Sequence, residues 1–190
     1  MASKIKVDQI QTADGTGTIA LQNQLSGLAS ASMPTGSVLQ VKQSTFADDA
    51  GTSSTSYQDI PLSVAITPIS TSSKILVQVN IWAGVNDTGQ YGVLLQLLRD
   101  STQINMGNAE GSRPRVMGVA YSPAHDYDLY PIIANYLDSP NTTSSTTYKV
   151  QFRSGWSGSK TVYINRGGSD TDNAGGARTM STITVMEIAG

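Results

Sequence analysis

The chain contains no cysteine and only one histidine among its 190 residues. Without cysteine it forms no disulfide and offers no thiolate to a metal, so its core or its association must stabilise the fold. Only 14% of the residues are charged, and the 12 lysines and arginines are scattered along the sequence. A nucleic-acid-binding protein normally clusters its basic residues to neutralise several phosphates. We therefore expect no nucleic-acid partner.

Long apolar runs are also missing. No stretch approaches the ~18 apolar residues that span a bilayer, and residues 1–7 lack the apolar core of a secretory signal. We expect no membrane insertion. The chain instead has 24 serines and 20 threonines, whose hydroxyls rather than charges meet water at the surface. A surface with so few charges must limit aggregation by covering its sheet edges or by tight assembly.

The residues that usually carry catalysis are scarce. His125 is the only histidine, and Glu110 and Glu187 are the only glutamates. A nucleophilic triad needs a base, and a glycosidase needs a defined pair of carboxyl groups. Nothing singles out such a pair among the twelve aspartates. We expect a non-catalytic protein without a cofactor, and release of sugar from a host polysaccharide would contradict this expectation.

Two pairs of aspartates could each offer carboxylate oxygens to a metal ion. Asp126 and Asp128 flank one residue, as do Asp170 and Asp172. Calcium takes six to eight oxygen ligands, and neither stretch has the spacing of an EF-hand loop. Solvated turns explain both pairs, so we expect no metal site.

The first 35 residues differ from the rest of the chain. A short alternating run precedes a turn-forming stretch at residues 13–17. Residues 18–21 fit a second short strand, and residues 22–28 fit one or two helical turns. A unit this small cannot bury its own apolar side chains, so it is either a flexible tail or ordered by association. We expect residues 1–35 to be an attachment and oligomerisation segment with a linker, followed by a head at residues 36–190. The apolar residues expected to make the attachment are Ile5, Val7, Ile10, Ile19 and Leu21.

From residue 37 onward, short strands separated by polar turns recur. In residues 147–153, Tyr148, Val150 and Phe152 alternate with polar neighbours, as in a strand with one buried face. Pro61 in the run 57–67 indicates an edge strand or a bend. This rhythm predicts an all-β fold, an antiparallel β-sandwich of the jelly-roll kind. Strands are predicted at residues 37–42, 57–67, 73–82, 92–99, 130–137, 147–153, 160–165 and 179–188.

Two of these runs, 92–99 and 179–188, are apolar on both faces. One sheet of a sandwich can cover only one face of the other sheet. We interpret the second apolar face as packing against a neighbouring subunit, and therefore expect an oligomer.

The sequence resembles tail-fibre and other virion-associated proteins of tailed, cyanophage-like bacteriophages. The resemblance begins with residues 6–19, KVDQIQTADGTGTI, and continues through 36–41, 62–77, 97–101, 136–140, 148–153 and 181–188. These markers cover most of the chain in one order. The resemblance implies a homotrimeric virion protein, anchored to other virion proteins through residues 1–33, with its head exposed for contact with a host-surface glycan. The chain lacks the extended shaft of long fibres, so a purely structural role, such as a capsid decoration or baseplate connector protein, stays open.

Two loops are candidates for recognition. The first spans residues 121–130, whose tyrosine rings suit sugar rings and whose aspartates can accept hydrogen bonds from sugar hydroxyls; alternatively, its tyrosines pack on the sandwich or on a neighbouring subunit. The second is the long, glycine-rich polar stretch 165–178, since such loops are often functional or mobile. The ligand-binding residues predicted in the first loop are Tyr121, His125, Asp126, Tyr127, Asp128 and Tyr130.

Overall fold

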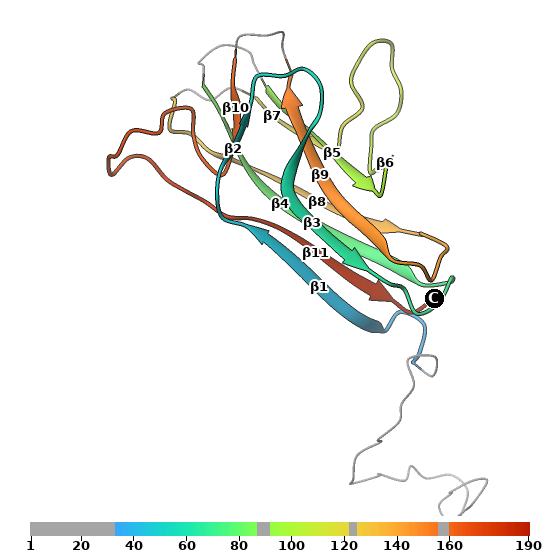
Figure 1. Cartoon of the computed structure of the whole chain (residues 1–190). Helices are drawn as coiled ribbons and strands as arrows, with labels where there is room; N and C mark the ends of the chain where they lie inside the picture. The colour runs from blue at the N-terminus through green and yellow to red at the C-terminus, as the bar shows by residue number, and fades with distance from the viewer. Residues whose placement is uncertain (1–32, 87–91, 122–124, 156–159) are drawn as a thin grey trace, which may run out of the picture.

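A computed structural model describes residues 33–86, 92–121, 125–155 and 160–190, and these residues form two antiparallel sheets (Figure 1). The six-stranded sheet contains β1 (Val38–Phe46), β2 (Ala50–Thr52), β4 (Lys74–Val85), β8 (Tyr130–Asp138), β10 (Val162–Ile164) and β11 (Ser181–Ile188). The five-stranded sheet contains β3 (Gln58–Ile66), β5 (Gly92–Arg99), β6 (Thr102–Ile104), β7 (Gly118–Tyr121) and β9 (Thr146–Ser154). None of the described residues forms a helix long and apolar enough to cross a membrane.

The strand order is that of a jelly roll. In the six-stranded sheet the longer strands lie in the order β1-β11-β4-β8, and in the other sheet the order is β3-β9-β5-β7. The chain passes from one sheet to the other six times: between β2 and β3, β3 and β4, β4 and β5, β7 and β8, β8 and β9, and β9 and β10. The first and last strands, β1 and β11, are neighbours. Two four-stranded sheets wound in this way make a jelly-roll sandwich. The predicted fold class is confirmed.

The core lies between the sheets and is built by alternation. In β3 the side chains at positions 60, 62, 64 and 66 are buried while their neighbours are exposed. In β9, Tyr148, Val150 and Phe152 are buried as predicted. Alternate residues of a strand face opposite sides, so a run of this pattern turns one apolar face inward. Pro61 lies in an edge strand, where the register between β3 and β9 is interrupted.

The predicted strands all occur, but their bounds differ. β1 extends to Phe46, four residues beyond the prediction, whereas β10 is reduced to three residues. Three short strands were missed, β2, β6 and β7, and Tyr121, which we assigned to a loop, ends β7. Strands of three or four residues are too short for periodicity to identify them.

The two-faced apolar strand β5 needs no neighbouring subunit to cover it. Leu94 and Leu98 point away from the core, yet they are only 6% and 7% exposed in the single chain. Leu94 lies against the backbone at Gly155, and Gln96, between the two leucines, donates a hydrogen bond to Gln151 at 2.5 Å. The prediction that a neighbouring subunit covers this strand is therefore wrong, because the chain itself covers the second apolar face of β5.

Two buried carboxylates, Asp138 and Glu187, lie near one end of the sandwich. Asp138 of β8 pairs with Arg99 of β5 at 2.9 Å and accepts a hydrogen bond from the Tyr148 hydroxyl of β9 at 2.7 Å. Burial, together with the adjacent Asp138 carboxylate, holds the pKa of Tyr148 well above its ordinary value, so the phenol keeps the proton that it donates. This cluster fixes β8 to the opposite sheet.

Glu187 is the second of these carboxylates, and it is 0% exposed. Its two oxygens accept hydrogen bonds from the side chain of Gln40 at 2.6 Å and from the backbone N–H of Ile69 at 2.7 Å. Burial raises the pKa of Glu187, but these hydrogen bonds outweigh burial, so the pKa lies below the ordinary 4.5. Glu187 thus fastens the β3–β4 connection to β1 and β11.

Met33, where the described chain begins, and Gly190 lie at this same end. The backbone N–H of Gly36 donates to the Ala189 carbonyl, and that of Ala189 to the Ser37 carbonyl, each at 2.8 Å. We call this the basal end, defined by residues 33–37 and 189–190 (Figure 1).

Replacing Glu187 with Gln should destabilise the fold by about 1–3 kcal/mol at neutral pH, because a charge-assisted acceptor is lost in a buried position. Since the folded pKa is depressed, the carboxylate's contribution is complete above pH 4.5 and is lost as the pH falls through the folded pKa. Urea unfolding from pH 7 to pH 3 should show the two proteins converging in acid. The exposed Glu110→Gln is the matched control; an equal effect from both substitutions would contradict this role.

Candidate functional site

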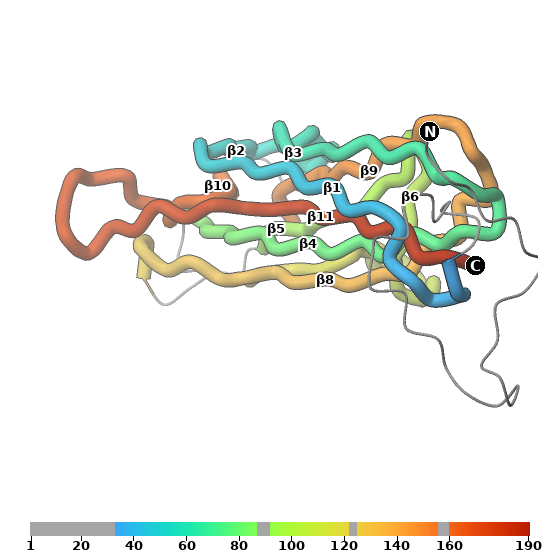
Figure 2. Tube along the Cα trace, turned by 90° about the horizontal axis from the view of Figure 1, so that it is seen from below, coloured from blue at the N-terminus to red at the C-terminus, as the bar shows by residue number. Residues whose placement is uncertain are grey.

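The two loops that the sequence singled out separately lie against each other at the end of the sandwich opposite the basal end. The backbone N–H of Ser169 donates to the Asp126 carbonyl at 3.0 Å, and the side-chain amide of Asn173 donates to the Tyr127 hydroxyl at 2.8 Å. A Cβ at Gly167 would lie 2.5 Å from the Asp126 carbonyl oxygen, so only glycine allows this approach. We call this the loop end, defined by residues 125–130 and 165–178. Figure 2 shows the second loop extending beyond the strands, away from the C-terminus.

Asn165 holds the base of the longer loop. It is 0% exposed, and its φ of 66° lies in the left-handed region that asparagine tolerates better than most residues. Its side-chain nitrogen donates to the carbonyls of Phe46 and Asp48, both at 2.7 Å, and its side-chain oxygen accepts from the Ser181 hydroxyl at 2.6 Å. Its backbone N–H donates to the Trp82 carbonyl at 2.8 Å. One side chain therefore joins the ends of β1, β10 and β11.

Beside Asn165, two arginines share carboxylates. Asp49 accepts from Arg166 at 2.8 Å and from Arg178 at 2.6 Å, and Arg178 also pairs with Asp170 at 2.5 Å. The guanidinium of Arg166 stacks 3.6 Å from the centre of the Tyr163 ring. The hydrogen bond from Arg166, with further help from Arg178, outweighs burial and lowers the pKa of Asp49. Both arginines are thus partnered within the chain.

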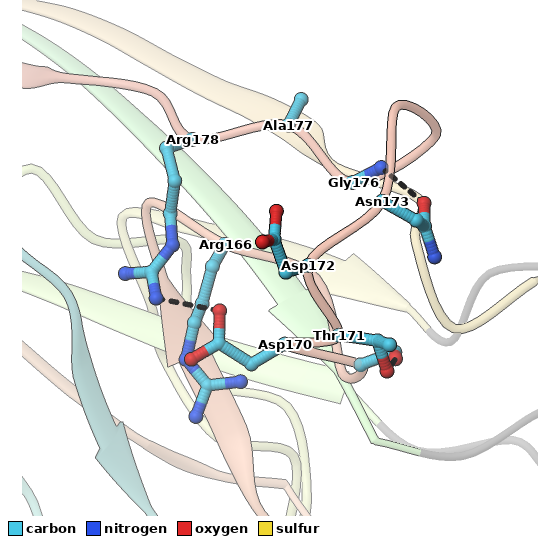
Figure 3. A pocket seen from close by; sticks show the side chains of 9 residues that line it. Arg166, Asp170, Thr171, Asp172, Asn173, Gly176, Ala177 and Arg178 are labelled. Atoms are coloured by element: carbon cyan, nitrogen blue, oxygen red, sulfur yellow. Dashed lines mark hydrogen bonds and ion pairs between the residues drawn. The ribbon is translucent and has the colours of Figure 1, made fainter.

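The loop 165–178 encloses a hollow of about 290 Å³ (Figure 3). Its polar lining supplies two hydroxyls, an amide, two carboxylates and two partnered guanidinium groups. Its lining residues are Arg166, Ser169, Asp170, Thr171, Asp172, Asn173, Gly176, Ala177 and Arg178. Hydroxyls and amides both donate to and accept from sugar hydroxyls, and carboxylates accept from them, so the hollow can bind a polar, uncharged ligand.

Of the predicted ligand-binding residues, Tyr127 contacts the lining of the hollow through its side chain, which bonds to Asn173. Its ring carbon would lie 3.8 Å from a Cβ at Gly176. Hydrogen bonds from Ser169 and Asn173 lower the pKa of its phenol. Tyr127 therefore adds one aromatic ring beside a polar cavity.

The other predicted residues lie at the same end, and none of them lines the hollow. Tyr121 ends β7 and is 66% exposed, and Tyr130 begins β8. His125 and Asp128 bond to each other: the backbone N–H of His125 donates to the Asp128 carboxylate at 3.1 Å. Asp126 is exposed and contributes its carbonyl to the loop contact. The six residues do not form a single cluster around the hollow.

Several residues that build this end were not predicted. Asp49 lies 117 residues from Arg166 and 129 from Arg178, and no local pattern links them. In the described part of the chain, no three His, Asp or Glu side chains come together as metal ligands. The predicted attachment residues Ile5, Val7, Ile10, Ile19 and Leu21 lie outside the described residues.

Comparison with known proteins adds little to this architecture. No family model matches the chain, and no curated protein matches it. Among solved structures, it is similar to one of infectious bursal disease virus strain Gx, with 16% identity over 79% of this chain and 37% of that chain and a TM-score of 0.39. It is also similar to T=1 particles derived from infectious bursal virus, with 17% identity over 80% and 37% and a TM-score of 0.35.

A third similar structure is the VP2 subviral particle of infectious bursal disease virus, with 12% identity over 80% of this chain and 39% of that chain and a TM-score of 0.32. The chain spans less than two fifths of the length of each of these three chains. TM-scores this low carry no argument about function. The assignment to the jelly-roll class rests on the strand order of the chain itself.

Replacing Asn165 with Gly should keep the left-handed backbone but remove three buried side-chain hydrogen bonds, at a cost of about 2–4 kcal/mol. Asn141→Gly is the matched control, since Asn141 has a φ of 53° and is exposed. Its effect should stay within about 1 kcal/mol. Urea unfolding measures both. Equal losses would show that Asn165 is selected for its backbone conformation alone.

Proposed function

We propose that this protein is a non-catalytic structural component of a virion, joined to the particle through residues 1–33 and projecting its β-sandwich outward. A capsid decoration or baseplate connector protein would be a protein of this kind. The observation that carries the proposal is the two-ended head: residue 33 enters at the basal end, and the long polar loop lies at the opposite end. The resemblance of residues 6–19 to the N-terminal segments of phage virion proteins supports it.

The two ends are separated by the length of β11. This strand starts at Ser181 beside Asn165 and ends at Ile188 beside the basal residues. Eight residues at about 3.3 Å each place the ends on the order of 26 Å apart. A segment bound to the particle below the basal end leaves the loop end accessible.

The attachment is tested in the full chain by the paired substitution Val7→Asp and Ile10→Asp. Charges at these apolar positions should reduce incorporation into purified particles by about tenfold or more, because a buried unpaired carboxylate costs several kcal/mol. The matched control places the same charges at polar neighbours, Gln9→Asp with Gln11→Asp. Quantitative immunoblotting of particles is the readout. Equal incorporation of both variants and the wild type would refute attachment through this segment.

A second function, host attachment in the manner of a tail fibre, is favoured by the hollow at the loop end. A polar cavity beside the Tyr127 ring has the groups that bind sugars: hydroxyls and amides for hydrogen bonding and an aromatic face for stacking. An oligomer of the chain would present several such loop ends, and avidity would then multiply a weak single-site affinity.

Glycan-array binding and host-cell adsorption by the full chain test this second function. Tyr127→Ala should weaken binding about tenfold, because it removes the ring beside the hollow. Tyr121→Ala is the control, since that exposed tyrosine lies on β7 rather than on the hollow. No binding by the wild-type chain would exclude host attachment, and equal losses would exclude the hollow as its site.

A further inference from the structure

The outer face of the six-stranded sheet has almost no charge. We define this outer face by the outward-pointing side chains of β1, β11, β4 and β8, which lie side by side in that order (Figure 2). Across these four strands, Lys74 is the only charged outward side chain, and its ammonium donates to the Ser139 hydroxyl at 3.0 Å. A sheet face that meets water normally carries charged and polar side chains. This outer face carries almost no charged side chains.

An apolar row crosses all four strands of the outer face. The register pairs Val41 with Met186, Met186 with Leu76, and Leu76 with Leu137. Val41 and Leu137, at the two ends of the row, are 55% and 51% exposed. Ile133, further along β8 on the same face, is 66% exposed. Contiguous exposed apolar side chains of this kind mark interaction surfaces.

Next to the apolar row lies a row of neutral polar side chains. Gln43 donates to the Thr184 hydroxyl at 2.8 Å, and Gln78 donates to the Asn135 side-chain oxygen at 3.1 Å. Each of these groups both donates and accepts hydrogen bonds, so the row can meet an identical row without leaving like charges opposed. The outer face has too little charge to bind a partner through electrostatic attraction. The chemistry of the outer face therefore fits a copy of itself.

The area also fits. Four strands about 4.8 Å apart, each about nine residues long at about 3.3 Å per residue, present roughly 600 Å². Two such faces together bury roughly 1,200 Å², which reaches the lower end of the range for specific, stable interfaces. Sheets packed face to face are the same arrangement that forms the core of this sandwich.

We propose that the outer face is the contact between two copies of this chain, packed sheet against sheet about a twofold axis. An interface that uses the same patch on both subunits is isologous and closes as a dimer. The outer face lies along the side of the sandwich, so both the basal end and the loop end of each copy stay accessible. The dimer does not require attachment to a particle, so an experiment can refute either proposal without refuting the other.

Light scattering of the full chain across a range of concentrations tests the dimer. The wild type should reach twice the 20.0 kDa chain mass. Ile133→Lys with Leu137→Lys should weaken the dimer about 100-fold, because it would bury unpaired charges in an apolar contact. Val119→Lys, at an exposed apolar position of the other sheet, is the control and should leave the mass unchanged. A monomer at all concentrations, a trimer, or a dimer indifferent to the lysines would overturn the proposal.

Cross-linking provides a test that does not depend on the lysine variants folding. The chain has no cysteine, so Gln78→Cys places a single thiol at the middle of the outer face. Mild oxidation should link most of this variant into covalent dimers. Ser112→Cys, in the exposed β6–β7 connection, should link no faster than random collision allows. Equal cross-linking of the two variants would count against the proposed face.

Discussion

The loop end depends on one buried side chain, Asn165. Its hydrogen bonds reach the end of β1, the end of β4 and the start of β11. These contacts fix the backbone from which Arg166 reaches Asp49. A buried amide with unmet hydrogen-bonding groups would be costly, and here the donors and acceptors converge on it from separate strands. The polar loop can extend beyond the sandwich because its base is held rigidly.

The fold was predictable because alternation is strong in the long strands. In β3 from Ile60 to Ile66, and in β9 from Tyr148 to Phe152, every second side chain is apolar, and each of these is buried. The same reasoning failed for the short strands β2, β6 and β7 and for Leu94 and Leu98. Their cover comes from the chain itself, through neighbours distant in sequence such as Gly155. Local periodicity predicts which face is apolar, but not what covers it.

The site was predictable only in its parts. Glycine and polar residues marked both loops, and the structure brings Tyr127 against Asn173. Their meeting depends on the order of strands across the six-stranded sheet, which no short motif encodes. Asp49 lies far from Arg166 in sequence and carries no signal of its partner. Hydrogen bonds across the fold, rather than residue types, build this end of the molecule.

The central claim is that the head is held by its basal end and presents its loop end outward. A cryo-electron microscopy map of the virus particle that carries this protein tests it most directly. The account predicts sandwich-shaped density on the particle exterior, with residue 33 toward the particle and residues 165–178 toward solvent. Absence from the particle, or a loop end buried against other virion proteins, would contradict it.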